Sequence, residues 1–89
     1  MSNKKLLRML NKLAEGLLDH NEACFACGEN PDSAEAVKEA GDSALRMVAI
    51  YDKYEDPSWQ VWAFIAEQHA DQYQFLLRLQ PKDMEIDDA

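Results

Sequence analysis

Apolar residues recur along the chain at intervals of three and four, in three separate segments. This spacing places side chains on one face of an α-helix. Three prolines separate the segments, and proline is expected where one helix ends or the next begins. The alternation of apolar and polar residues that marks a half-buried strand is not sustained anywhere. The pattern predicts an all-α protein with helices at about 3–27, 31–54 and 57–79.

The ends of these helices carry their own signals. Gly28 is expected at the C′ position that closes the first helix. The second helix has a capping box at 32–35, with either Asn30 or Asp32 as the N-cap. The third opens on Asp56-Pro57, an N-cap followed by proline at the first helical position, where the missing N–H costs nothing.

Each predicted helix has one apolar face. The faces comprise Leu6, Leu10, Leu13, Leu17 and Cys24 flanked by Leu7, Ala14, Leu18 and Phe25; then Val37, Ala40, Ala44, Val48 and Tyr51 widened by Met47; then Trp59, Trp62, Ile65, Ala66, Tyr73 and Leu76. Gly16 indicates either a kink or the close approach of a neighbouring helix. We expect the third helix, which holds both tryptophans, to be the one against which the others pack.

Three amphipathic helices of matched length with short connections predict an antiparallel up-down-up three-helix bundle. It forms a single domain over residues 1–80, followed by a flexible acidic tail at 81–89. The alternative is a helical hairpin that completes its core by dimerising. The N-terminus does not resemble a signal peptide, and no apolar run approaches the roughly 20 residues that span a bilayer. We therefore expect a soluble, cytoplasmic protein.

The charge is unevenly distributed. The chain has 17 acidic and 9 basic residues, a net charge of −8. Four of the bases (Lys4, Lys5, Arg8 and Lys12) lie in the first 12 residues, which contain no acid. The remaining chain is strongly acidic. It is expected to repel nucleic acid and anionic membranes and to attract basic protein surfaces.

The acidic residues form rows at helical spacing. Carboxylates about 5–6 Å apart on a rigid helix approximate the spacing of backbone phosphates. A protein that binds nucleic acid through lysine and arginine could bind such a surface instead. The alternative is an ordinary solvated face that keeps a small domain soluble. The rows are Glu15, Asp19 and Glu22 on the first helix; Asp32, Glu35, Glu39 and Asp42 on the second; and Glu67 and Asp71 on the third.

Two phenylalanines of the third helix do not belong to its main apolar face. At roughly 100° per residue, Phe64 and Phe75 lie well over 90° from the face that carries Trp62 and Tyr73. We expect them to be exposed, and a contiguous exposed apolar patch usually marks a partner surface. The alternative is that a side chain of the first helix or the tail covers them.

Histidine and cysteine offer one candidate metal cluster. His20, Cys24 and Cys27 lie along one side of the first helix, but zinc usually takes four ligands from two elements. With the helix ends level, His69 is expected about 13 Å from Cys24 along the bundle axis, which is too far to share one metal ion. The simpler interpretation makes Cys24 a small core residue, with His20 and Cys27 at the boundary. The cysteine pair lies at a helix C-terminus, where the dipole disfavours a reactive thiolate.

His69 falls on the apolar face of the third helix, where a histidine is more often a neutral, hydrogen-bonded core residue than a catalytic base. No nucleophile or carboxylate pair is spaced to join it. We therefore expect no enzymatic activity and no cofactor.

These observations predict a small acidic protein-binding domain. The specific hypothesis is an inhibitor or modulator whose carboxylate rows occupy the basic nucleic-acid-binding surface of a target protein. Small phage-encoded inhibitors of host defence systems share this short, acidic character, although no motif links this chain to them. The alternatives are a homo-oligomeric adaptor, for instance a homodimer, and a metal or thiol protein that uses the histidine–cysteine cluster.

Overall fold

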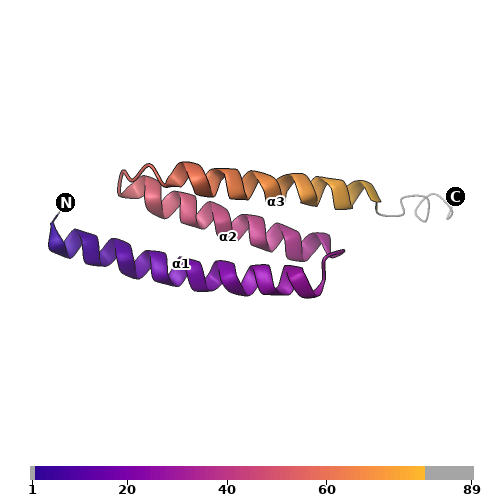
Figure 1. Cartoon of the computed structure of the whole chain (residues 1–89), viewed down its shortest axis with the longest axis horizontal. Helices are drawn as coiled ribbons and strands as arrows, with labels where there is room; N and C mark the ends of the chain where they lie inside the picture. Colours follow the sequence, from indigo (N-terminus) through magenta and orange to yellow (C-terminus); the bar gives the residue numbers. More distant parts are fainter. Residues whose placement is uncertain (1, 80–89) are drawn as a thin grey trace, which may run out of the picture.

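The computed structural model describes residues 2–79 and confirms the three-helix bundle. The helices are α1 (Asn3–Glu29), α2 (Ala34–Lys53) and α3 (Trp59–Leu79), with no strand in the described range. They run up, down and up, with α2 between the other two (Figure 1). The acidic tail predicted at 81–89 lies outside the described residues. Within residues 2–79, no helix combines the length and the apolarity needed to cross a membrane.

The end of α1 differs from the prediction. The helix begins after Ser2, whose side chain accepts a hydrogen bond from the Lys5 N–H at 3.1 Å. It ends at Glu29 and is followed by the C-cap Asn30, whose N–H donates to the carbonyl oxygen of Ala26 at 3.0 Å. Gly28 lies inside the last turn, and none of the described glycines has a positive φ. The assignment of Gly28 to the C′ position is therefore wrong.

The N-cap of α2 is Ser33, which replaces both predicted candidates. Its hydroxyl accepts a hydrogen bond from the Ala36 N–H at 3.2 Å. The predicted box at 32–35 does not form, because with Ser33 as the cap the third helical residue is Ala36 and not Glu35. Residues 31–33 instead lie in the connection, so α2 begins three residues later than predicted.

A left-handed residue ends α2. The N–H of Asp56 donates to the Tyr51 carbonyl at 2.9 Å and that of Glu55 donates to the Asp52 carbonyl at 3.0 Å. These two bonds define a Schellman motif, with Glu55 at φ 58° in the place where glycine is usual. The sequence does not mark this position, because the usual signal for a left-handed residue is glycine and this residue is glutamate.

The start of α3 differs from the prediction, which made Asp56 the N-cap and Pro57 the first helical residue. The Asp56 carboxylate accepts a hydrogen bond from the Ser58 N–H at 2.8 Å, and this bond holds the pKa of Asp56 below its ordinary value. Pro57 and Ser58 form a turn that precedes the first helical residue. The helix therefore begins at Trp59, two residues later than predicted.

The central helix is α2, and the prediction that α3 would take this place is wrong. The buried residues of α2 are Ala34, Val37, Ala40, Ser43, Ala44 and Met47. Only Ala66 and Leu76 are buried on α3, while Trp62 is half-buried and Trp59 is exposed. The reason is geometric: α2 has a neighbour on each side, whereas the backbones of α1 and α3 approach α2 and not each other.

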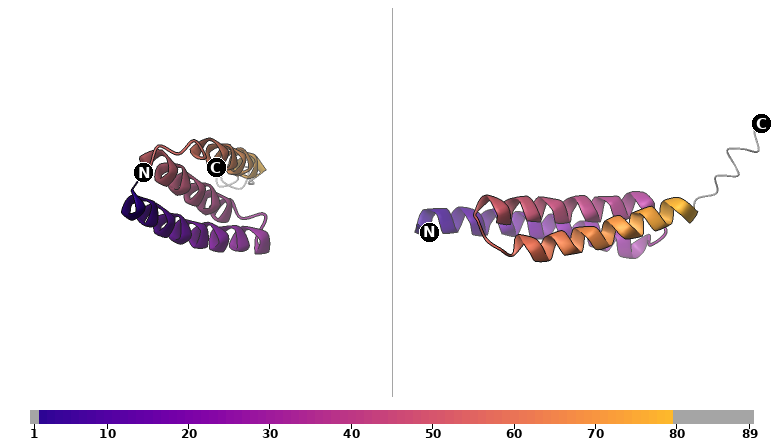
Figure 2. Two further views of the ribbon diagram at one scale, coloured as in Figure 1. Left: turned by 60° about the vertical axis from the view of Figure 1, so that its left-hand side comes forward. Right: turned by 90° about the horizontal axis from the view of Figure 1, so that it is seen from above.

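The buried face of α1 also differs from the prediction. Met9, Leu13 and His20 are buried, whereas the predicted core residues Leu6, Leu10 and Leu17 are exposed. The start of α1 extends past the end of α2, where no other helix lies beside it (Figure 2). Farther along, only the side of α1 nearest α2 is buried. The other side, which we call the leucine side, stays in solvent and carries Leu6, Leu7, Leu10, Leu17 and Leu18.

Gly16 allows α1 and α2 to approach closely. A Cβ atom at this position would lie 2.5 Å from the sulfur of Met47 and 3.2 Å from Cδ1 of Ile50. Because Met47 is fully buried, its side chain has little room to move away. Of the two predicted roles for Gly16, the structure supports close approach.

Candidate functional site

A shallow groove between α1 and α2 is lined by four acidic residues. It has a volume of about 440 Å³ and lies in the half of the bundle nearest the α1–α2 connection. Asp19 and Glu22 come from α1, and Glu35 and Glu39 come from α2. Alanines of both helices and Ser33 complete the lining. We call this feature the acidic groove, and it brings together acids from two of the predicted rows.

Bases of the same chain pair with part of the predicted rows. Arg46 of α2 reaches across to α1, where its Nε donates to Oδ2 of Asp19 at 2.9 Å. Asp42 pairs with Lys38 at 3.1 Å, and Glu15 pairs with Lys12 at 3.7 Å.

The other three acids of the groove are not neutralised in this way. Glu22, Glu35 and Glu39 form no ion pair within the described range. Because all three are exposed, the negative charge of the groove rests mainly on them.

The remaining predicted acids lie elsewhere. Asp32 is exposed in the turn before α2, and Glu67 and Asp71 are exposed on α3. No residue of α3 lines the acidic groove. The predicted rows therefore do not merge into one continuous acidic surface.

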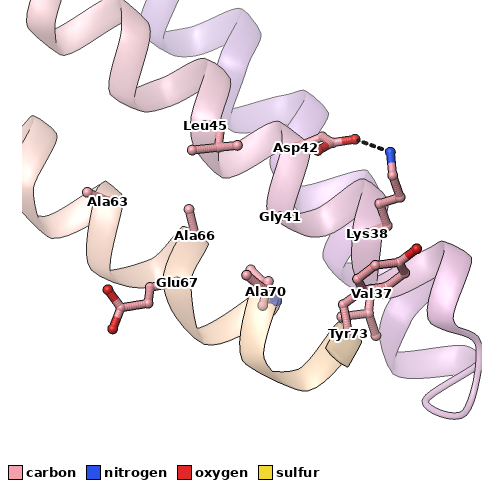
Figure 3. A pocket seen from close by; sticks show the side chains of 11 residues that line it. Val37, Lys38, Gly41, Asp42, Leu45, Ala63, Ala66, Glu67, Ala70 and Tyr73 are labelled. Carbon is pink, nitrogen blue, oxygen red and sulfur yellow. Dashed lines mark hydrogen bonds and ion pairs between the residues drawn. The ribbon is translucent and has the colours of Figure 1, made fainter. Parts of the chain in front are cut away.

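A second groove, between α2 and α3, is mostly apolar. It has a volume of about 410 Å³, and the small residues Gly41, Ala66 and Ala70 leave it open. Figure 3 shows the alanines of α3 facing α2, with Glu67 directed away from α2. The ion pair between Lys38 and Asp42 lies at its rim.

Exposed apolar side chains form a second class of candidate contacts. Phe64 and Phe75 are 61% and 53% exposed, which confirms their predicted exposure. The sequence interpretation missed the leucine side of α1, which it assigned to the core. The larger exposed apolar residues on the two outer helices are Leu6, Leu7, Leu10, Leu17, Leu18 and Phe25 of α1, and Trp59, Val61, Phe64, Phe75 and Leu79 of α3.

A third feature is a cluster of histidine and cysteine between the helices. One potential ligand atom from each of His20, Cys24 and His69 lies within 4.8 Å of the other two. The expectation that His69 lies too far along the axis is therefore wrong. It assumed that α1 and α3 start level, whereas α3 starts well along α1 (Figure 1). Cys27 is not part of this group and packs against the cluster of Ala34, Val37 and Leu76.

Side chains from all three helices hold His20 in place. Its Nδ1 lies 2.8 Å from the hydroxyl of Ser43 on α2, and its Nε2 lies 3.2 Å from the sulfur of Cys24. The Trp62 ring of α3 meets the imidazole edge to face, with ring centroids 5.0 Å apart. Sequence periodicity gave no sign of Ser43 or Trp62 as partners of His20, because both lie on other helices.

Burial shifts the titration of this cluster. Desolvation, and then the charge of His69, lower the pKa of His20, while Asp19 acts in the opposite direction. Desolvation also lowers the pKa of His69. It raises the pKa of the Cys24 thiol, and Cys27 adds to this rise. The folded protein therefore favours neutral imidazoles and a protonated thiol.

We expect the stability of the metal-free protein to fall on both sides of neutrality. Below about pH 6.5 the unfolded chain binds more protons than the folded one, because its histidines keep their ordinary pKa. Above about pH 8.5 the folded chain keeps the Cys24 proton that the unfolded chain releases. Urea unfolding with a chelator present, from about pH 5.5 to 9, checks both limbs.

Matched variants assign each limb to its residue. His69→Gln is expected to lose less stability than the wild type on acidification, and Cys24→Ser less on alkalinisation. Acid and alkaline losses equal to those of the wild type in both variants would contradict the assignment.

The three features differ in how far the sequence revealed them. The rows of acids and the exposed phenylalanines were visible as spacing, whereas the groove and the role of His69 needed the relative positions of the helices. Comparisons with protein-family models, with curated proteins and with solved structures found no match.

Proposed function

We propose that this protein works by binding a protein partner through the acidic groove, without catalysis. The partner presents lysine and arginine side chains, and a nucleic-acid-binding protein has such a surface. In this proposal the chain is an inhibitor or modulator that occupies the nucleic-acid site of its target. The observation that supports it most directly is the convergence of Glu22, Glu35 and Glu39 on one groove without a neutralising base in the described range.

Binding of a basic partner to the groove is favourable for a simple electrostatic reason. Glu35 and Glu39 stand one helical turn apart on α2, and Glu22 faces them from α1. Like charges at helical spacing repel mildly in the free protein. A cation placed between them relieves that repulsion and also gains direct attraction. The two helices fix the backbone positions of these residues in advance, so binding has to order only their side chains.

The ion pair between Asp19 and Arg46 supports the groove without adding charge to it. It joins α1 to α2 at one end of the lining. An exposed pair of this kind contributes at most about 1 kcal/mol to stability. Its role in the proposal is to set the distance between the two walls.

Charge reversal tests the proposal. The double variant Glu35→Lys/Glu39→Lys is expected to lose its partner in a pull-down from extract of the source organism at low salt. The reversal removes attraction and adds repulsion against a basic surface. Duplex DNA or RNA is expected to release the partner captured by the wild type.

The matched control is Glu67→Lys/Asp71→Lys, which changes the net charge equally but lies on α3, outside the groove. This variant is expected to keep the partner. Equal loss in both variants would mean that only net charge matters. Retention by the groove variant would contradict the proposal.

Self-association is the second candidate function. Phe64 and Phe75 lie on α3 and do not border the acidic groove, so they suit a different contact. The basic first turns of α1 and the acidic groove also lie toward opposite ends of that helix. An untagged second copy in the same pull-down distinguishes this case, because recovery of that copy alone would favour a homo-oligomer.

A further inference from the structure

Three side chains from two helices place nitrogen and sulfur atoms around one point. His20 and Cys24 lie one turn apart on α1, and His69 reaches them from α3. Their potential ligand atoms are all within 4.8 Å of one another. We propose that His20, Cys24 and His69 bind a late first-row transition-metal ion, of which Zn²⁺ is the test case. This site is separate from the acidic groove and does not depend on the proposed function.

The hydrogen bonds around His20 prepare it as a ligand. The hydroxyl of Ser43 donates its one hydrogen to the carbonyl oxygen of Ala40 at 2.7 Å. The Ser43 hydroxyl oxygen lies 2.8 Å from Nδ1 of His20, so this oxygen must accept the Nδ1–H. Nε2 then carries a lone pair, and it is the nitrogen that faces Cys24 at 3.2 Å. A second-shell bond that fixes the tautomer in this way is typical of histidines that bind metal.

The distances are close to those that a metal requires. Zinc lies about 2.0–2.1 Å from nitrogen and about 2.3 Å from sulfur, so ligand atoms of a tetrahedral site are roughly 3.3–3.8 Å apart. The Cys24 sulfur and the His20 nitrogen already meet at 3.2 Å. The widest separation, at most 4.8 Å, closes by about 1 Å through small side-chain rotations. Soft sulfur together with imidazole nitrogen favours zinc or copper over magnesium or calcium.

The position of His69 supports the same site. Its ring lies beside that of His20, with centroids 5.9 Å apart. The hydrogen bonds within residues 2–79 leave its ring nitrogens without a protein partner. Gly41 of α2 lets α3 come this close, because a Cβ there would lie 3.3 Å from Cβ of His69. His69 also lines the groove between α2 and α3, which gives an ion a path from solvent.

Binding exchanges one proton for the metal. The ion forms a bond with the Cys24 sulfur and with one nitrogen of each histidine. The thiol proton, which in the free protein lies between sulfur and Nε2 of His20, is released to solvent. Each neutral imidazole binds through a nitrogen lone pair and releases no proton. No residue is oxidised or reduced. Three protein ligands leave one position for water or for a side chain of another molecule.

The test is a Zn²⁺ titration of the reduced, metal-free full chain against a competing chromophoric chelator. We expect one ion per chain. Cys24→Ser and His69→Gln should each weaken binding by more than the roughly 10- to 100-fold that loss of a second-shell partner costs. Cys27→Ser is the matched control on the same helix, and its affinity should equal that of the wild type. Co²⁺ should give a thiolate charge-transfer band that disappears in Cys24→Ser.

Circular dichroism of each variant shows whether the helices persist, so that loss of binding is not confused with unfolding. If His69→Gln unfolds, the Zn²⁺ titration is repeated with His69→Asn, and the Co²⁺ spectrum of the wild type tests the metal site directly. The proposal is overturned if the wild type does not compete with the chelator. It is also overturned if Cys27→Ser loses as much affinity as Cys24→Ser, or if binding survives both ligand substitutions. Those results would leave the cluster as a hydrogen-bonded contact between α1 and α3.

Discussion

Replacing Met47 with alanine is expected to lower the free energy of unfolding by about 2–5 kcal/mol, the cost of a large-to-small change in a packed core. Met47 is fully buried and packs with Met9, Leu13 and Tyr54, so it joins the two helices where α1 comes closest. For a domain of this size each kcal/mol shifts Tm by roughly 4–8 °C. Thermal unfolding followed by circular dichroism measures the change.

The matched control is Leu18→Ala on the exposed side of α1. Leu18 is 64% exposed, so its loss should change stability by no more than about 0.5 kcal/mol. Equal destabilisation by the two variants would mean that α2 is not the central helix and that the leucine side of α1 is packed.

Ser43→Ala is expected to have the second largest effect, a loss of about 1–3 kcal/mol. Ser43 is fully buried and accepts the Nδ1–H of His20, which is itself 9% exposed. Alanine fits the space but removes the hydroxyl oxygen that accepts from this buried donor. Urea denaturation of the metal-free protein gives the difference in stability.

A double-mutant cycle with His20→Leu separates the pair from its surroundings. Leucine carries no hydrogen-bond donor, so each single variant removes the bond between the two side chains. The two changes should couple by about 0.5–3 kcal/mol, as expected for residues in direct contact. Strict additivity would show that the hydrogen bond contributes nothing.

The apolar face of α2 could be predicted from the sequence, and that of α1 could not. Val37, Ala40 and Ala44 follow one helical stripe, and that stripe is buried because α2 has neighbours on both sides. In α1 the leucines form an equally clear stripe, but a neighbour covers only part of it. Periodicity shows which residues share a face. It does not show whether another helix covers that face.

The features that the sequence did not predict depend on how far the helices are shifted along one another. With their ends level, His69 would lie far from His20, yet α3 starts well along α1 and the two rings meet. The shift follows from the length of α1 and from the turn at Glu55. This residue has a left-handed backbone but is not glycine, so the sequence does not predict the turn. The rows of acids, like the stripe of leucines, could be predicted because helical spacing alone places them on one face. Their meeting in one groove, and the pairing of Asp19 with Arg46, depend on how α1 and α2 pack.

The acidic groove is most directly tested by the salt dependence of partner binding. The affinity of the partner captured at low salt should fall by at least about tenfold between 50 and 300 mM NaCl, because exposed charges are screened over this range. The Glu67→Lys/Asp71→Lys variant should show the same slope. An affinity that stays within about twofold over this range would mean that the carboxylates of the groove do not bind the partner.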